Sequence, residues 1–95
     1  MTIETVKEKT GPVFKQYGVI RAAVFGSVAR GTSSADSDVD FLVNLHRPFG
    51  LIQFVALKRG LESVLNKSVD VVEYDAVKPA FANNILKDAT IIYEQ

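Results

Sequence analysis

Within 95 residues, short apolar runs of strand length alternate with longer segments of helical spacing, and this alternation limits the folds that the chain can adopt. Strands are predicted over residues 19–25, 38–45, 68–74 and 90–93, and helices over residues 3–17, 49–66 and from Pro79 through Leu86. Residues 1–95 are expected to form one domain, because so short a chain has no room for two. The order favours an α+β fold in two layers, in which a small mixed sheet of about four strands packs against helices.

The first predicted helix leaves two questions open. Thr5 and Glu8 have the spacing of a capping box, and Thr2 is an equally suitable N-cap. Gly11 and Pro12 could divide this helix or delay its start, because proline removes a backbone donor. A helix over residues 3–17 is predicted, with the effect of Gly11 and Pro12 left open.

The charge balance and the missing residue types exclude several kinds of site. Eleven Lys and Arg match eleven Asp and Glu, so nucleic-acid binding driven by a basic surface is not expected. The chain has no cysteine, and His46 is its only histidine, which excludes disulfides, thiolate nucleophiles and metal sites with two His ligands. With no recognisable signal peptide and no bilayer-spanning apolar stretch, a cytoplasmic protein without a membrane partner is expected.

Three aspartates lie in predicted strands. Asp38 and Asp40 are two residues apart, so their side chains point to the same face of a sheet. Asp70 lies in the apolar run 69–72, where a charge is unfavourable without a partner. If the two strands are neighbours, the three carboxylates converge and repel one another. A divalent cation resolves this conflict, and Mg²⁺ suits carboxylate oxygens and bridges to substrate phosphates. A site for two Mg²⁺ ions is expected, in which they activate the attacking oxygen and stabilise the leaving one.

A Gly-Ser pair follows the first predicted strand. Gly26 allows close approach of the backbone to a ligand, and Ser27 offers a hydroxyl beside free backbone N–H groups. Alone, the pair is a weak signal, and Ser27 is equally suited to cap a helix. At a fixed distance before Asp38 and Asp40, it indicates a phosphate-binding site.

Gly26-Ser27, ten intervening residues and then Asp38-x-Asp40 resemble the signature of the nucleotidyltransferase fold in the DNA polymerase β superfamily. The strings Phe-Gly-Ser-Val-Ala-Arg-Gly at 25–31 and Ser-Asp-Val-Asp-Phe at 37–41 resemble its minimal nucleotidyltransferase (MNT) branch, and the likeness covers essentially the whole chain. Such enzymes transfer a nucleoside monophosphate from a nucleoside triphosphate to a hydroxyl, with Mg²⁺, and release pyrophosphate. The resemblance implies this reaction here, with ATP as the expected donor.

The resemblance also implies a role for each motif residue. Asp38 and Asp40 are expected to bind the metal ions that hold the triphosphate. Asp70 is expected to complete the second metal site and to help activate the acceptor hydroxyl. The Gly-Ser pair is expected to contact the terminal phosphates. Arg30 is expected either to meet phosphate or to hold its own loop.

Simpler explanations exist for the same residues. Asp38 and Asp40 could be solvated acids at the start of a strand. Asp70 could be a charge that protects an edge strand from aggregation. Arg30 could be a surface cation. The fixed spacing to the Gly-Ser pair favours the catalytic interpretation over these alternatives.

The MNT resemblance implies a partner protein. Members of this branch are commonly paired with a small helical HEPN protein, often as antitoxin and toxin, and some transfer AMP to that partner. Two hypotheses follow: an enzyme that modifies a protein hydroxyl, or a catalytically weak antitoxin that neutralises its partner by binding alone. Three intact carboxylates favour the enzyme. Phe49, Leu51 and Ile52 are candidates for an exposed partner patch, and self-association of the chain is a further state left open.

Overall fold

The computed structural model describes residues 1–34 and 36–95. The elements follow one another as α1 (Ile3–Gln16), β1 (Val19–Phe25), α2 (Gly26–Arg30), β2 (Val39–Leu45), α3 (Leu51–Leu65), β3 (Val69–Glu73), the 3₁₀ turn η1 (Tyr74–Ala76), α4 (Pro79–Asp88) and β4 (Thr90–Glu94). Within the described residues the strands form a four-stranded sheet in the order β3-β2-β1-β4. The β2–β3 pair is parallel and the other two pairs are antiparallel, so the predicted α+β fold with a small mixed sheet is confirmed.

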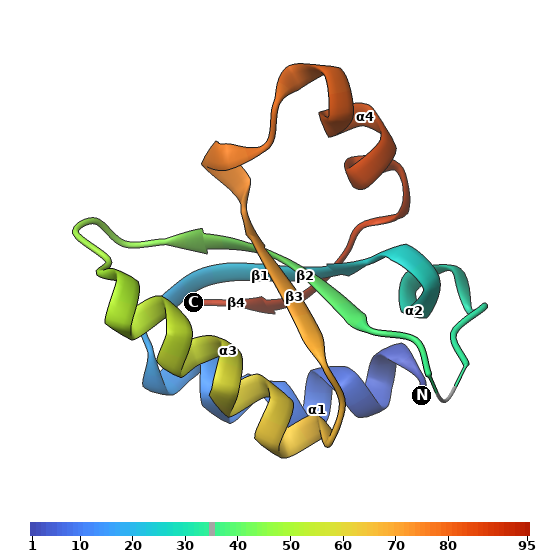
Figure 1. Ribbon diagram of the computed structural model, residues 1–95, viewed down its shortest axis with the longest axis horizontal. Coiled ribbons are helices and arrows are strands. Elements are labelled where there is room, and N and C mark those ends of the chain that lie inside the picture. Colours follow the sequence, from blue (N-terminus) through green and yellow to red (C-terminus); the bar gives the residue numbers. More distant parts are fainter. Residues whose placement is uncertain (35) are drawn as a thin grey trace.

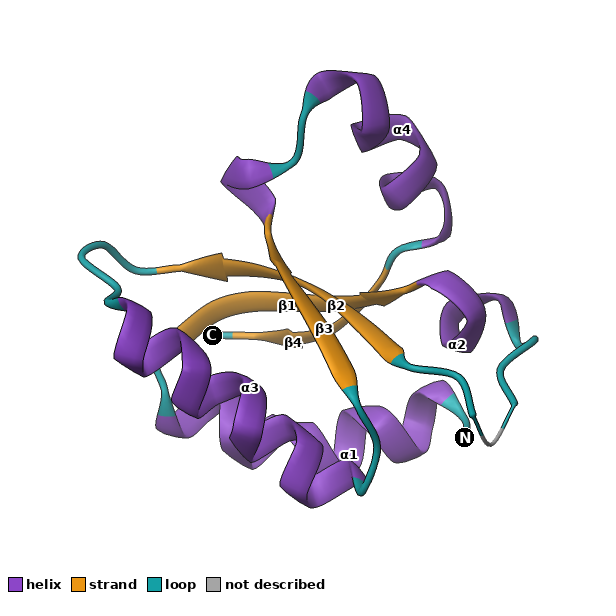
Figure 2. Ribbon diagram, in the orientation of Figure 1, coloured by secondary structure: helices purple, strands orange, loops and turns teal. Residues whose placement is uncertain are grey.

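Helices α1 and α3 cover one face of the sheet, whereas η1 and α4 lie on the other side (Figures 1 and 2). The core fills the space between the sheet and the two long helices. Phe14 of α1 meets Phe41 of β2 edge-on, with ring centroids 5.6 Å apart, and Leu57 and Leu61 of α3 are fully buried. The core-facing residues of β2 are Val39, Phe41, Val43 and Leu45. The alternate positions of β2, Asp40 among them, face the less covered side.

Helix α1 passes through Gly11 and Pro12 without a break. Its N-cap is Thr2, whose side-chain oxygen accepts a hydrogen bond from the Thr5 N–H at 3.2 Å. Proline cannot donate to the carbonyl four residues earlier, and burial of the two apolar residues that follow it offsets this local cost. Neither α1 nor any other helix in the described part of the chain is long and apolar enough to span a membrane.

The element boundaries differ from the predicted ones by one or two residues. Helix α3 begins two residues late because Gly50 is its N-cap, where the Gly50 N–H donates to the Gln53 side chain at 2.8 Å. Strand β2 starts one residue late, at Val39. Strand β3 ends early because Tyr74 enters η1, and β4 continues to Glu94.

The register of the sheet brings three distant segments together. Phe25, the last residue of β1, pairs with Asp40 of β2, and Asp40 pairs in turn with Asp70 of β3. The Gly-Ser pair follows Phe25 directly and opens α2. The first residues of β2 therefore lie between the Gly-Ser turn on one side and Asp70 on the other.

Candidate active site

Asp40 and Asp70 are direct partners across the parallel strands β2 and β3. Residues in register on neighbouring strands project to the same face of a sheet, so both carboxylates lie on the face opposite α1 and α3. Asp40 is half-buried, and Asp70 is exposed. Asp38 is also exposed and lies one residue before β2. The condition on which the predicted site depended, that the second and third strands are neighbours, is therefore met.

The surroundings of Asp40 raise the pKa of its carboxyl group above the ordinary value of 3.8. Burial contributes most, followed by repulsion from the Asp70 carboxylate and then from the Asp38 carboxylate. The Arg30 guanidinium acts in the opposite direction. A bound cation would offset both the lost hydration and the repulsion, so this carboxylate is well placed to hold one.

Gly26 approaches Asp40 more closely than a residue with a side chain could. Its φ is +73°, and a Cβ at this position would lie 2.3 Å from Asp40 Oδ2. Both the left-handed backbone and the close approach require glycine. Gly26 thereby places Ser27 and the first turn of α2 beside the Asp40 carboxylate, where a phosphate bound by the turn would also meet a cation held by the carboxylate.

Arg30 is held by a residue that the sequence did not reveal. Its Nη1 lies 3.1 Å from Oδ2 of Asp88, in the last turn of α4, so the ion pair ties α2 to α4. In this arrangement Arg30 holds its own segment, and its charge also acts on Asp40. Asp88 is 58 residues away in the chain, and no local pattern links two positions so far apart.

Asp70 occupies a different environment from the one its apolar neighbours suggested. The sequence predicted an unfavourable, desolvated charge, whereas the residue is exposed. The reason is that β3 is an edge strand and that Val69, not Asp70, points into the core. Asp70 therefore has the edge position expected of a charge that blocks aggregation. It also has the pairing with Asp40 expected of a catalytic carboxylate.

The donor set at this site fits a hard divalent cation. Among residues 1–34 and 36–95, no three His, Asp or Glu side chains are arranged to hold a metal ion by themselves. Mg²⁺ usually takes only one or two protein carboxylates and completes its shell with water and substrate phosphates. Asp40, flanked by Asp38 and Asp70 and in contact with the Gly-Ser turn, offers carboxylates where phosphate oxygens can complete such a shell.

Comparison with known proteins identifies the same family. The family model described as "Polymerase beta, Nucleotidyltransferase" matches residues 8–95. A predicted protein adenylyltransferase of Methanocaldococcus jannaschii is 40% identical over 89 residues, which are 94% of this chain and 96% of that protein. Protein adenylyltransferase MntA of Thermococcus cleftensis is 35% identical over 78 residues, which are 82% of this chain and 79% of that protein.

Solved structures share the fold. The structure of a predicted minimal nucleotidyltransferase superimposes with a TM-score of 0.81 at 34% identity, covering 95% of both chains. The structure of a tri-AMPylated Shewanella oneidensis HEPN toxin in complex with MNT antitoxin contains a chain that superimposes with a TM-score of 0.74 at 16% identity. The match covers 98% of this chain and 73% of the matched chain, and at this identity it shows the fold alone. The matched family model, the curated relatives and the pairing of Asp40 with Asp70 beside Gly26 agree, and the chain belongs to the polymerase β-type nucleotidyltransferase family.

Proposed function

We propose that this protein transfers AMP from ATP to a hydroxyl group of a partner protein, with two Mg²⁺ ions that Asp38, Asp40 and Asp70 would bind together with the substrate phosphates. The observation that carries the proposal is the in-register pair of Asp40 and Asp70 with Gly26 in contact with Asp40. The names of the curated relatives, which are protein adenylyltransferases, support AMP as the transferred group and protein as the acceptor.

In the proposed reaction, the groups on the two sides of Asp40 have different roles. On the side of the Gly-Ser turn, Gly26 and Ser27 bind the terminal phosphates and orient the triphosphate. On the side of β3, Asp70 accepts a hydrogen bond from the acceptor hydroxyl and directs its oxygen at the α-phosphorus. The new O–P bond forms as the bond to the bridging oxygen of the β-phosphate breaks, pyrophosphate leaves, and the hydroxyl proton passes to Asp70 or water. Bound Mg²⁺ supplies charge neutralisation of the phosphates at this site.

We further propose that the acceptor belongs to a HEPN-type helical protein that this chain neutralises as an antitoxin. The MNT antitoxin that shares this fold is in complex with an AMPylated HEPN toxin, which supports such a partner. The start of α3 offers a contact surface, since the Leu51 and Ile52 side chains are 78% and 86% exposed. Phe49, expected in the same patch, instead packs partly against the core.

The direct test is transfer of label from ATP, carrying an α-phosphate label, to a purified HEPN-type partner. Wild-type protein with Mg²⁺ should label the partner, and Asp38→Asn/Asp40→Asn and Asp70→Asn should reduce labelling by at least about a hundredfold, as expected when groups that act on the transition state are removed. Asp75→Asn is the matched control, because Asp75 is an exposed aspartate in η1, five positions beyond Asp70. Equal labelling by the aspartate variants and the wild type would refute the proposal.

A thermal shift separates a failed nucleotide site from a missing acceptor. Mg²⁺-ATP at about 100 times its Kd should add about 2.7 kcal/mol to the stability of the folded state. We expect this shift in the wild type and in Asp75→Asn and not in Asp38→Asn/Asp40→Asn. Labelling that fails although the shift is present would point to the wrong acceptor and leave the nucleotide site in place.

A further inference from the structure

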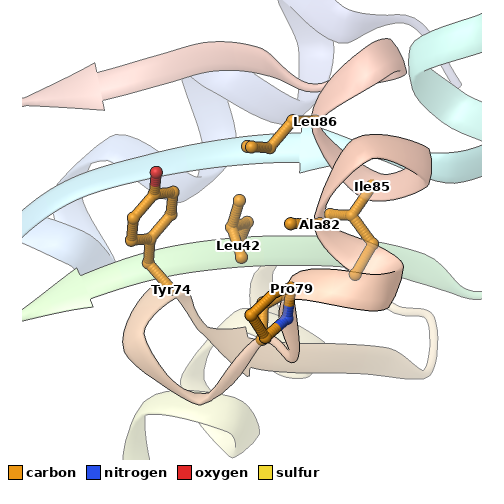
Figure 3. Close-up of a pocket in the computed structure, with 7 residues that line it drawn as sticks. Leu42, Tyr74, Pro79, Ala82, Ile85 and Leu86 are labelled. Atoms are coloured by element: carbon orange, nitrogen blue, oxygen red, sulfur yellow. The ribbon is translucent and has the colours of Figure 1, made fainter.

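An apolar hollow lies on the same face of the sheet as the carboxylates (Figure 3). Its volume is about 230 Å³, and β2, η1 and α4 enclose it. The residues that surround it in Figure 3 are Leu42, Tyr74, Pro79, Ala82, Ile85 and Leu86. Leu42 forms the floor, and Tyr74 stands across the hollow from Ile85 and Leu86. An aromatic ring over an aliphatic floor is a surface on which a flat, apolar group can stack.

A second hollow of about 240 Å³ adjoins the first and introduces polar groups. The two hollows share Leu42, Tyr74 and Leu86, so they form one continuous depression above β2. Asn44 of β2 and Arg21 of β1, which are partners in the sheet, line its far end. Arg21 is already paired with a neighbour, since its Nε lies 3.3 Å from Oε2 of Glu94. Asn44 therefore brings an amide, with one donor group and one acceptor group, to an otherwise mainly apolar depression.

The depression continues directly from the catalytic carboxylates along a single strand. Asp40, Leu42 and Asn44 are alternate residues of β2 and lie on the same face. At about 3.3 Å per residue, Leu42 is roughly 7 Å and Asn44 roughly 13 Å along the strand from Asp40. The Gly-Ser turn lies beyond Asp40 in the opposite direction, because Phe25 pairs with Asp40 at the end of β1. A triphosphate that extends from Asp40 toward this turn therefore directs its nucleoside toward Leu42.

We propose that this depression holds the base of the donor nucleotide and that Asn44 makes it selective for adenine. The inference rests on the proposed nucleotidyltransferase function and adds the determinant of its base preference. The base stacks between Tyr74 and Leu86 above Leu42, and the Asn44 amide meets the N6 amino group and N7 of adenine. An acceptor hydroxyl fits this place less well, since it must reach the α-phosphate at Asp40 and Asp70 and not the far end of the strand.

The hydrogen-bonding pattern of Asn44 distinguishes the two purines. On its N6–N7 edge, adenine offers one donor and one acceptor, which match the carbonyl and the amino group of an asparagine side chain. Guanine offers two acceptors at the corresponding positions, O6 and N7, so the asparagine carbonyl would face an acceptor. A good bidentate pair distinguishes the right base from the wrong one by roughly five- to a hundredfold. We expect the wild type to bind Mg²⁺-ATP at least about fivefold more tightly than Mg²⁺-GTP.

The test compares Mg²⁺-ATP, Mg²⁺-GTP and Mg²⁺-triphosphate by isothermal titration calorimetry. Inorganic triphosphate has no base, so its Kd reports the carboxylates and the Gly-Ser turn alone. Asn44→Leu should raise the Kd for ATP about tenfold and bring it near the Kd for GTP, without changing the Kd for triphosphate. Tyr74→Ala should raise the Kd for both nucleotides about tenfold. Tyr74→Phe should keep both Kd values near those of the wild type, because the aromatic ring stacks on the base. Asp75→Ala, in the same turn as Tyr74, is the matched control.

Each result decides between the base and another occupant. Unchanged ATP affinity in both Asn44→Leu and Tyr74→Ala would overturn the inference, and if those variants also lost transfer to protein, the hollow would be an acceptor site. The inference would also be overturned if these variants bound triphosphate and ATP with equally reduced affinity, since the substitutions would then disturb the phosphate site. If the wild type binds neither triphosphate nor ATP, the proposed function fails and the inference falls with it. Tyr74 is 45% exposed, so its alanine variant should fold, as circular dichroism would verify.

Discussion

Gly26 and Gly31 have the same backbone torsion and different surroundings. Both have φ +73°, but a Cβ at position 26 would lie 2.3 Å from Asp40 Oδ2, whereas a Cβ at position 31 would have no neighbour within 4 Å among the described residues beyond those adjacent in the chain. Alanine in this left-handed conformation costs about 1–2 kcal/mol. We expect Gly31→Ala to lose that much stability and keep its affinity for Mg²⁺-ATP. Gly26→Ala should lose at least as much and also displace Asp40, which weakens Mg²⁺-ATP binding.

Urea unfolding and titration with Mg²⁺-ATP measure the two effects separately. The shared torsion makes Gly31→Ala a control for backbone strain, so any difference in nucleotide affinity reports the contact with Asp40. If both alanine variants bind Mg²⁺-ATP equally well, the close approach of Gly26 to Asp40 has no part in nucleotide binding.

The raised pKa of Asp40 makes stability depend on pH in a definite direction. Burial and the neighbouring Asp70 and Asp38 raise the pKa of the folded form above 3.8, whereas the unfolded chain keeps the ordinary value. The folded state therefore holds the proton more tightly, and the contribution of this group to stability is fully present below about pH 3.8 and is lost as the pH rises through the folded pKa. Asp40→Asn removes this loss. Without metal, we expect the variant to be at least as stable as the wild type at neutral pH.

Urea unfolding in a chelator, from acid to neutral pH, measures this difference. The advantage of Asp40→Asn should shrink as the pH falls below the folded pKa, where the wild-type carboxyl is also uncharged. Asp75→Asn removes the charge of an exposed aspartate outside the site and serves as the control. If the Asp40→Asn protein is clearly less stable than the wild type at neutral pH, the Asp40 carboxylate is not destabilised by burial and by its charged neighbours.

Among the helices, two interior glycines distinguish the effect of helix propensity on stability from the effect of packing between helices. In the part of the chain that the structure describes, a Cβ at Gly11 in α1 would meet no atom of another segment within 4 Å. One at Gly60 in α3 would lie 3.2 Å from Val13 Cγ1, where α1 and α3 pack together. Glycine within a helix costs about 0.5–1 kcal/mol relative to alanine. We expect Gly11→Ala to raise the free energy of unfolding by about that amount. Gly60→Ala should gain less or lose stability, because Val13 is buried and has little room to move.

Urea unfolding of the two variants at one pH checks this difference. If both alanine variants raise the free energy of unfolding by the same amount, then α1 and α3 must move apart enough to accept the added methyl group. Neither glycine touches the carboxylates, so nucleotide binding serves as a control that should stay unchanged in both proteins.

The elements also show what the sequence could and could not predict. Alternation along β2 separates Asp40 from the core-facing residues, as the period of a strand predicts, because strand geometry is local. The apolar neighbours of Asp70 suggested a desolvated charge, whereas Asp70 is exposed on an edge strand, the position that its alternative interpretation required. Neither the Arg30–Asp88 ion pair nor the hollow beneath α4 could be read from the sequence, since both join segments far apart in the chain. The roles assigned to the carboxylates stay predictions.

The two faces of the sheet expose different groups. The carboxylates and the apolar depression lie on the face with η1 and α4, and the exposed residues at the start of α3 lie on the side of the other face (Figure 1). The proposed partner surface on α3 and the proposed nucleotide site at Asp40 are therefore separate. Such a separation allows the enzymatic and the binding-only hypotheses to be tested in one protein.

Two sets of variants should show opposite defects, one in partner binding and the other in nucleotide transfer. Leu51→Glu/Ile52→Glu places charges in the exposed apolar patch, and we expect at least about tenfold weaker binding to the HEPN-type partner with unchanged affinity for Mg²⁺-ATP. Val64→Glu, at the other end of α3 and also partly exposed, is the control and should leave both affinities near those of the wild type. Asp38→Asn/Asp40→Asn should bind the partner normally and lose nucleotide transfer.

The outcome in cells distinguishes the two hypotheses. If the protein neutralises its partner by modifying it, the aspartate variant should lose protection against the toxin although it still binds it. Protection that survives in Asp38→Asn/Asp40→Asn and is lost in Leu51→Glu/Ile52→Glu would show that binding alone neutralises the partner. Catalysis would then be dispensable for neutralisation, and the close approach of Gly26 to Asp40 would need another explanation.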